Sequence, residues 1–397
     1  MQNNIKGFNQ MITRKIAKEL LVLVTEYPVV TILGPRQAGK TTLAKELLKD
    51  YEYSNLEIPE TRHFAQEDPK AYLAQFSTRV IIDEIQRVPE LLSYIQGIVD
   101  EEKQNGRFVL TGSHQLLLRE AVSQSLAGRT AILNLLPFSI SELENAKIEF
   151  DSFEEYCFTG FLPRIYDQNI RPNTAHSNYY QTYVERDVRQ LINLKDISLF
   201  EKLLKLMAGR VGQIIDYSSL ANDTGVSVKT IQNWISILEA SFIIFKLSPY
   251  FENFGKRIIK SPKYYFTDPG LLCFLLGIRK PEQISRDPLV GNIFENLVVI
   301  ECLKSRFNQG QMPDLYFFRD TNGNEVDIIF QDGRELVAIE IKSASTFSSS
   351  QLAGIKRFKK TSRQVGHSYL VYNGDDIRLR EQINAINFKH ISSIFEN

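Results

Sequence analysis

Residues 34–41 read Gly-Pro-Arg-Gln-Ala-Gly-Lys-Thr, a G-x-x-x-x-G-K-T pattern that stands between two regular segments. The apolar run 29–33 is predicted as a buried strand, and residues 43–48 have the spacing of a helix. A strand, a turn and a helix N-terminus in this order aim backbone N–H groups and the positive end of the helix dipole at one point. This stretch is therefore predicted to bind the phosphates of a nucleotide such as ATP.

The predicted ATP-binding residues form the turn and the start of the helix. They are Gly34, Pro35, Arg36, Gln37, Ala38, Gly39, Lys40, Thr41 and Thr42. Lys40 would pair with the phosphate charge, and the Thr41 hydroxyl would ligate Mg²⁺. Gly34 and Gly39 are expected to take positive φ and to let the backbone approach the phosphates without a Cβ in the way.

An acidic pair follows a second predicted strand, 79–83. Asp83 is predicted to hold the Mg²⁺, because P-loop ATPases use a carboxylate at the end of a neighbouring strand for this purpose. Glu84 is predicted to polarise the attacking water as general base. A solvated strand end is the structural alternative for the pair, and the phosphate-binding loop upstream favours the ATPase interpretation.

A third predicted strand, 107–110, leads into Thr111 and Ser113. Ser113 is the first choice, and Thr111 the second, for a polar side chain between the attacking water and the γ-phosphate. Ordinary turn residues are the alternative. Strands and helices in this order predict a parallel α/β sheet, and ligands bind such sheets at the carboxyl ends of the strands.

Three arginines are further candidates. Arg129 and Arg186 are each a candidate arginine finger that acts in cis or in trans on the γ-phosphate, with a structural salt bridge as the alternative for both. Arg14, on a predicted helix over 11–26, is interpreted first as a surface charge, with a contact to the nucleotide base as the alternative.

Composition limits the class of protein. The 397 residues suggest two or three domains, and 47 basic against 47 acidic residues exclude a polycation, so any nucleic-acid surface must be local. No apolar run approaches the length of a membrane span, and the N-terminus lacks a signal-peptide pattern, so we expect a cytoplasmic protein. The three cysteines stand far apart and are expected as buried thiols.

The middle of the chain has the pattern of a winged helix. Residues 201–280 carry 11 Lys and Arg against 6 Asp and Glu. A short helix, a turn at Gly225 and a second helix over 228–240 follow helix-turn-helix logic. Strands over 242–247 and 263–266 would form a wing with a basic tip at 256–260. Contact with DNA is predicted from the second helix and the wing, and a lid or protein-docking module is the alternative.

The last third predicts a nuclease-like site. A helix is followed by predicted strands 315–318, 324–330 and 336–342, then by a helix and another strand. Strand alternation places Glu340 and Lys342 on one face, and Asp327 can meet them across the hairpin. The predicted ligands for a second Mg²⁺ or Mn²⁺ are Asp327, Glu340 and Glu295. Lys342 is predicted to orient water or to steady the transition-state phosphate, and a fold kept only for binding is the alternative.

The chain from about residue 10 to 390 resembles prokaryotic AAA-type ATPases near the origin-recognition and signal-transduction ATPases, which end in a domain of unknown function. The matching segments are 34–43, 83–86, 110–113, 126–129, 185–187 and 267–271. Residues 325–327 and 340–342 look like the PD-(D/E)xK nucleases. The family usually has two glycines in the segment that here reads Phe158-Thr159-Gly160-Phe161-Leu162-Pro163, so a sensor role of this turn is open. The resemblance implies binding of ATP and Mg²⁺.

These observations predict three folded units and a connector. They are a P-loop AAA-type ATPase domain over 1–150, a helical connector over 151–200, an α+β winged helix over 201–285, and an α/β restriction-endonuclease-like domain over 286–397. The predicted function is an ATP-hydrolysing, DNA-directed switch. The alternative is a nucleotide-dependent interaction protein with a catalytically inactive nuclease-like fold. A protein partner and an oligomer are compatible with either.

Overall fold

Continuous apolar runs in the first third form a parallel sheet. The computed structural model describes residues 12–113, 125–185, 197–250, 261–362, 364–379 and 382–396. The strands are β1 (Val29–Leu33), β2 (Glu52–Asn55), β3 (Val80–Asp83), β4 (Phe108–Gly112) and β5 (Thr130–Asn134). Their order is β2-β3-β4-β1-β5, and all pairs are parallel. The predicted parallel α/β fold of this part is confirmed.

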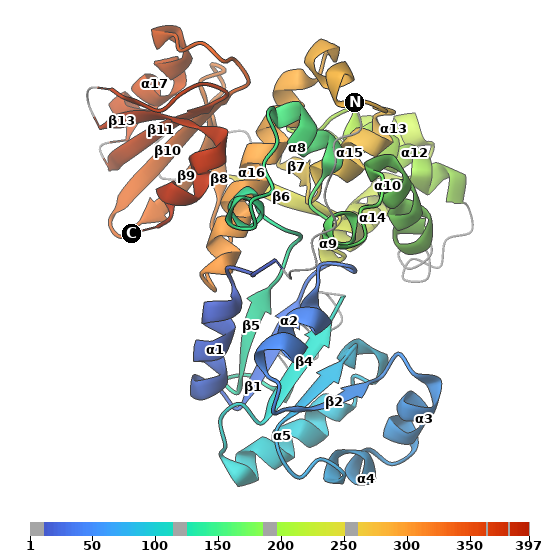
Figure 1. The fold of residues 1–397 in the computed structure, drawn as a ribbon. Coiled ribbons are helices and arrows are strands. Elements are labelled where there is room, and N and C mark those ends of the chain that lie inside the picture. The colour runs from blue at the N-terminus through green and yellow to red at the C-terminus, as the bar shows by residue number, and fades with distance from the viewer. Residues whose placement is uncertain are drawn as a thin grey trace.

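Helices cover both faces of this sheet, as the lower part of Figure 1 shows. They are α1 (Ala17–Glu26), α2 (Lys40–Leu47), α3 (Pro59–Glu67), α4 (Pro69–Ala74), the short η1 (Ile85–Arg87) and α5 (Leu91–Glu102). Leu20 of α1 and Leu43 of α2 pack with Val30 on one face, whereas Ile95 of α5 packs with Val80 on the other. Because both faces are buried, β1, β3 and β4 lack polar alternation.

The middle of the chain is mainly helical. Its elements are α7 (Ile140–Asn145), α8 (Phe153–Thr159), α9 (Pro163–Asp167), α10 (Pro172–Tyr179), η2 (Tyr180–Glu185), α12 (Ile197–Ala208), α13 (Tyr217–Thr224), α14 (Val228–Ala240), α15 (Pro269–Leu275) and η3 (Pro281–Arg286). The predicted turn between α13 and α14 is present, since Gly225 has a φ of 88° and Ser227 caps α14 through the N–H of Thr230 at 3.1 Å. The predicted wing tip, 256–260, lies outside the described residues.

The hairpin β6 (Ile244–Pro249) and β7 (Lys263–Phe266) extends the C-terminal sheet. The other strands are β8 (Tyr316–Arg319), β9 (Glu325–Asp332), β10 (Glu335–Lys342), β11 (Val365–Tyr372), β12 (Ile377–Arg378) and β13 (Ile383–Asn387), in the order β12-β13-β11-β10-β9-β8-β6-β7. Ser248 pairs with Tyr316 in a parallel ladder. The sheet therefore crosses the domain boundary predicted at 285–286, because the free edge of β6 forms its hydrogen bonds with β8.

Helices complete the C-terminal part: α16 (Val290–Asn308), η4 (Ser349–Leu352), α17 (Ala353–Thr361) and η5 (Phe388–Ile394). Helix α16 packs on β7, on β10 and on the middle helices α8 and α15, and so lies between the C-terminal sheet and the helical middle (Figure 1). The three cysteines are buried and unpaired. Among the described helices, none has the length and apolar character of a membrane span.

Candidate nucleotide site

The 34–41 loop joins β1 to α2 at the carboxyl edge of the parallel sheet. Gln37 and Gly39 have φ of 62° and 90°, the left-handed conformation that turns successive N–H groups toward a bound anion. Gly34 also has the expected positive φ, 159°. A Cβ at Gly34 would overlap the carbonyl oxygen of Leu135, so close packing against the segment after β5 also requires this glycine.

Lys40, the first residue of α2, is buried at the centre of the loop. Its Nζ donates to the carbonyl oxygens of Gly34 and Pro35, each at 2.9 Å. Burial lowers the pKa of Lys40 to about 8, although the nearby Glu84 and Asp83 carboxylates act in the opposite direction. A phosphate beside this ammonium would favour the charged form again.

Thr41 and Asp83 meet as predicted for a Mg²⁺ site. The Thr41 hydroxyl lies 3.0 Å from both Asp83 carboxylate oxygens. Thr111, the second choice after Ser113, also donates to Asp83, and Tyr53 on β2 donates to Oδ2 at 2.9 Å. A hydroxyl and a carboxylate at this spacing are the hard oxygen donors that Mg²⁺ prefers, so these residues fit the ion.

Glu84 is held beside Asp83 by a small polar network. Its φ of 58° is left-handed and turns the side chain away from the strand direction. Ser113 donates to Glu84 Oε2 at 3.2 Å, and Gln86 donates to the Ser113 hydroxyl at 3.1 Å and also contacts Glu84. The predicted base and the first-choice polar residue are therefore adjacent at the carboxyl edge of the sheet.

Arg14 is buried, so its interpretation as a surface charge is wrong. The guanidinium donates to the carbonyls of Ala38 at 2.7 Å and Leu136 at 2.6 Å, and pairs with Glu142 at 3.1 Å. It also lies 4.9 Å from the centre of the Phe138 ring. Arg14 therefore fastens the chain before α1 to the back of the phosphate-binding loop.

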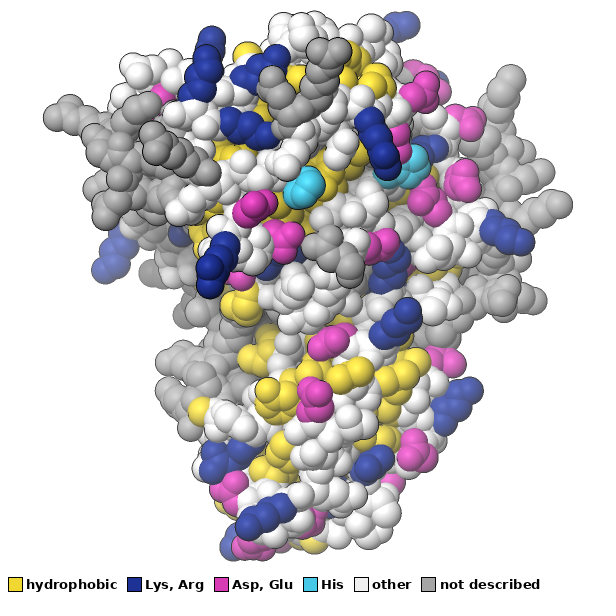
Figure 2. All heavy atoms as spheres, turned by 90° about the vertical axis from the view of Figure 1, so that its left-hand side faces the viewer, with side chains coloured by type: hydrophobic (Ala, Val, Ile, Leu, Met, Phe, Trp, Pro, Cys, Tyr) yellow, Lys and Arg dark blue, Asp and Glu magenta, His cyan; other side chains and the backbone are white. Residues whose placement is uncertain are grey.

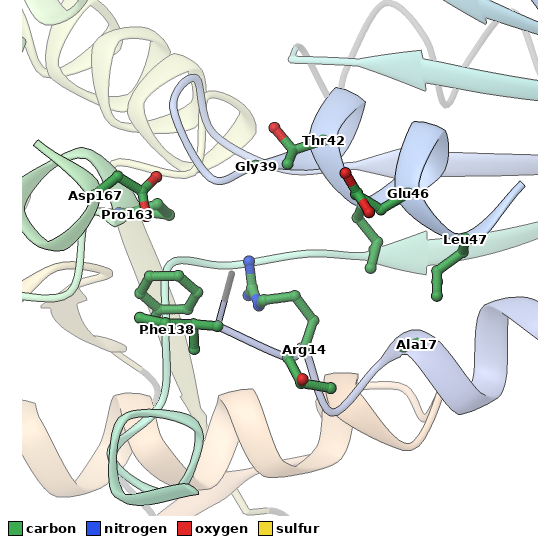
Figure 3. Close-up of a pocket in the computed structure, with 12 residues that line it drawn as sticks. Arg14, Ala17, Gly39, Thr42, Glu46, Leu47, Phe138, Pro163 and Asp167 are labelled. Carbon is green, nitrogen blue, oxygen red and sulfur yellow. The ribbon is translucent and has the colours of Figure 1, made fainter. Parts of the chain in front are cut away.

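A cavity of about 220 Å³ opens beside this arginine (Figure 3). Its lining residues are Ile12, Thr13, Arg14, Ala17, Gly39, Thr42, Leu43, Glu46, Leu47, Phe138, Pro163 and Asp167. Pro163 and Asp167 belong to α9, so the helical middle supplies the far wall. The Gly160 turn just before α9 packs against His176 and Asp268, where a Cβ would clash.

Neither candidate arginine finger is seen, among the described residues, at a position from which it would contact the γ-phosphate in cis. Arg129 precedes β5 and forms a two-point ion pair with Asp100, at 2.6 and 2.9 Å. Because Arg129 lies at the amino edge of the parallel sheet, it cannot act in cis on a phosphate at the carboxyl edge. Arg36 lies 3.8 Å from Glu57. Arg186 lies outside the described residues.

In the C-terminal sheet, Asp327, Glu340 and Lys342 come together across the hairpin as predicted. Lys342 Nζ lies 2.8 Å from Glu340 Oε1 and 3.6 Å from Asp327 Oδ2, and Asp327 accepts the N–H of Ile341 at 2.7 Å. Glu340 Oε2 is buried without a hydrogen-bond partner. Burial, helped by the Asp327 charge, raises the pKa of Glu340 to about 8.

Glu295 is engaged elsewhere in this cluster. Its carboxylate accepts from Lys263 Nζ at 3.0 Å and from Tyr265 OH at 2.5 Å. Lys263 also pairs with Glu325 at 2.7 Å. In the described part of the chain, no group of three or more His, Cys, Asp or Glu is arranged to hold a metal ion. The metal role of Glu295 with Asp327 and Glu340 therefore stays a prediction.

Comparison with known protein families finds three matching regions. A family model described as "AAA domain" matches residues 26–144. This region, which holds the parallel sheet and the 34–41 loop, is therefore similar to AAA domains. Models described as domains of unknown function, DUF8612 and DUF4143, match residues 150–282 and 290–391.

Curated relatives are similar to most of the chain. The chain is 29% identical over 372 residues to uncharacterized protein Rv2008c of Mycobacterium tuberculosis, covering 91% of this chain and 80% of that protein. It is 24% identical to an uncharacterized protein of Haemophilus influenzae, covering 83% and 86%. A Walker-type ATPase of Pyrococcus abyssi is similar in structure, with a TM-score of 0.41 and 14% identity over 67% of this chain and 96% of that one.

Proposed function

We propose that this chain is an ATP-hydrolysing switch in which the AAA-type domain drives a DNA-directed C-terminal half. One observation carries the ATPase part: Lys40, the Thr41–Asp83 pair and the Glu84–Ser113 pair share one edge of the sheet. Phosphate binding, metal binding and water activation need these three groups, and they need them within one site.

Each residue has a role that follows from its geometry. Lys40 would exchange its two carbonyl acceptors for phosphate oxygens, and Thr41 and Asp83 would hold the Mg²⁺ that shields the phosphate charge. Glu84 would accept the proton of the attacking water, while Ser113 keeps its carboxylate in place. Arg14 would hold the phosphate-binding loop beside the cavity that Thr42 and Phe138 line.

Removal of the ammonium is the direct test of nucleotide binding. Lys40→Ala is expected to weaken ATP binding roughly 10- to 100-fold, since a hydrogen bond to a charged group contributes about 1.5–3 kcal/mol. Titration calorimetry with ATP and Mg²⁺ measures the change. The exposed Lys49→Ala, just beyond α2, is the control. Equal affinity of Lys40→Ala and wild type would contradict the assigned role of the loop.

The DNA-directed part of the proposal rests on two regions. The α13–α14 pair has the helix, turn and helix order of DNA-binding proteins, and Lys229 and Asn233 lie on its exposed side. The C-terminal sheet presents carboxylates and a lysine of the kind used on phosphodiesters. The rival function is a nucleotide-dependent interaction protein, for which a pull-down with and without ATP would identify the partner.

A specific observation favours metal-dependent DNA cleavage as a second candidate function. Glu340 Oε2 is buried and unpaired next to Asp327, and an added Mg²⁺ or Mn²⁺ would satisfy both carboxylates. Lys342 would then steady the phosphate. Asp327→Ala and Lys342→Ala are each expected to abolish cleavage of DNA incubated with Mg²⁺ or Mn²⁺ and ATP.

The matched control for cleavage is Asp332→Ala, an exposed carboxylate at the far end of β9. It is expected to cleave like wild type. Absence of cleavage by the wild type would instead favour the inactive, binding-only fold, without affecting the ATPase proposal.

A further inference from the structure

A long basic segment begins at the proposed C-terminal site. Residues 341–374 contain six basic side chains and no acidic one. The six are Lys342, Lys356, Arg357, Lys359, Lys360 and Arg363. The whole chain has a net charge of zero, so a run of this length without a carboxylate is a strong local field. Four of these side chains belong to one short helix, α17.

Helix α17 is amphipathic, and its apolar side is already used. Ile355 and Phe358 are buried, and Phe358 packs on Phe318 of the sheet. Lys356, Arg357 and Lys360 are exposed on the other side. The helix packs on β9 and β10 in the C-terminal part of the molecule (Figure 1). Figure 2 faces this side of the molecule, where Lys and Arg side chains stand out from the upper part.

The basic helix starts directly over the carboxylate cluster. Gly354, its second residue, packs so closely that a Cβ there would lie 2.6 Å from Glu340 Oε2 and overlap the Glu325 carbonyl. Lys356 to Lys360 follow within the next two turns, at 1.5 Å of rise per residue. A bound polyanion that follows α17 would therefore pass the Glu340 and Lys342 side chains.

We propose that the exposed basic face of α17 is the main phosphate-contacting surface for DNA. The inference rests on the proposed DNA-directed function. It places the main contact with DNA on α17 and not on α14, the second helix of the predicted helix-turn-helix. Residues 217–240, which contain α13 and α14, carry one basic side chain, Lys229, against Asp223 and Glu239. Nonspecific affinity for DNA comes mainly from phosphate neutralisation, which three or four cations on one helix supply and a single lysine does not.

An anionic membrane fits this surface less well than DNA does. Interfacial helices bury their apolar face in lipid, whereas Ile355 and Phe358 of α17 are part of the protein core. The outward side of the helix carries the charged Lys356, Arg357 and Lys360. The neighbouring carboxylate cluster also suits a phosphodiester, since Lys342 offers a cation between two acidic side chains.

The test compares three full-length proteins by fluorescence anisotropy on a labelled DNA duplex across a salt series. They are the wild type, a triple variant with Lys356→Ala, Arg357→Ala and Lys360→Ala, and a control with Lys49→Ala, Lys70→Ala and Lys103→Ala on the ATPase domain, which changes the net charge equally. Loss of three phosphate contacts is expected to weaken binding by roughly tenfold or more and to reduce the salt slope by about 2.7. Thermal unfolding and ATP turnover, unchanged in both variants, check folding.

Each outcome decides a separate point. Weaker binding and a smaller slope in the α17 variant alone support the inference. Equal binding of the α17 variant and the control overturns the inference about α17 but not the proposed DNA-directed function. Lys229→Ala is then the variant that should lose affinity for DNA. No duplex binding by the wild type at low salt overturns both, and binding to vesicles of anionic lipid in place of DNA does the same. The ATPase proposal survives every one of these results.

Discussion

The Glu84→Gln variant is expected to hydrolyse ATP about 10²- to 10⁴-fold more slowly than wild type while still binding ATP. Glutamine keeps the size of the side chain and can keep a hydrogen bond to Ser113, which lies 3.2 Å from the Glu84 carboxylate. It cannot accept a proton from water. The substitution therefore separates the chemical step from nucleotide binding, which depends on Lys40 and Thr41.

Steady-state phosphate release measures the loss of turnover, and calorimetric titration measures the retained affinity. Glu90→Gln, just before α5 and exposed, is the matched control and should behave as wild type. Ser113→Ala provides a second readout, because release of the Glu84 side chain should lower turnover by less than loss of the carboxylate itself. Full turnover by Glu84→Gln would show that Glu84 is not the base.

Local sequence patterns predicted the parts of the site that lie on one strand and its following turn. The run 29–33, the 34–41 loop and Asp83-Glu84 each combine a buried strand with polar residues at its end, and parallel pairing brings such ends to one edge. The hairpin of β9 and β10 was predictable for the same reason, because a short turn and strand alternation place Asp327 beside Glu340.

Residues that join the sites from distant parts of the chain had no such signal. Tyr53 reaches Asp83 from β2, and Lys263 reaches Glu295 from the hairpin before α16. Their local patterns are those of ordinary strands, and only the tertiary fold shows the contact. The pairing of β6 with β8 was not predicted for the same reason. Nothing in the local sequence of residues 244–249 indicates which strand will pair with the free edge of β6.

Arg14→Met is expected to destabilise the protein by about 3–5 kcal/mol and to weaken ATP binding at the same time. Glu142, its partner, is only 1% exposed, so loss of the guanidinium leaves a buried carboxylate without its counter-charge. The Ala38 and Leu136 carbonyls lose their donors too. Because Ala38 belongs to the phosphate-binding loop, the stabilisation that ATP adds to the fold should fall with it.

Lys15→Met, at the neighbouring position, is the control. Lys15 pairs with Glu396, and the two side chains are 29% and 57% exposed, so loss of this pair should lower the free energy of unfolding by less than about 1 kcal/mol. Chemical unfolding with and without ATP measures both effects. The double variant Arg14→Met with Glu142→Gln should lose less stability than the two single changes added together, because no buried charge is then left alone. Additive losses would mean that the pairing with Glu142 contributes nothing and that Arg14 acts through its carbonyl hydrogen bonds and its packing against Phe138. An unchanged response to ATP would separate this arginine from the nucleotide site.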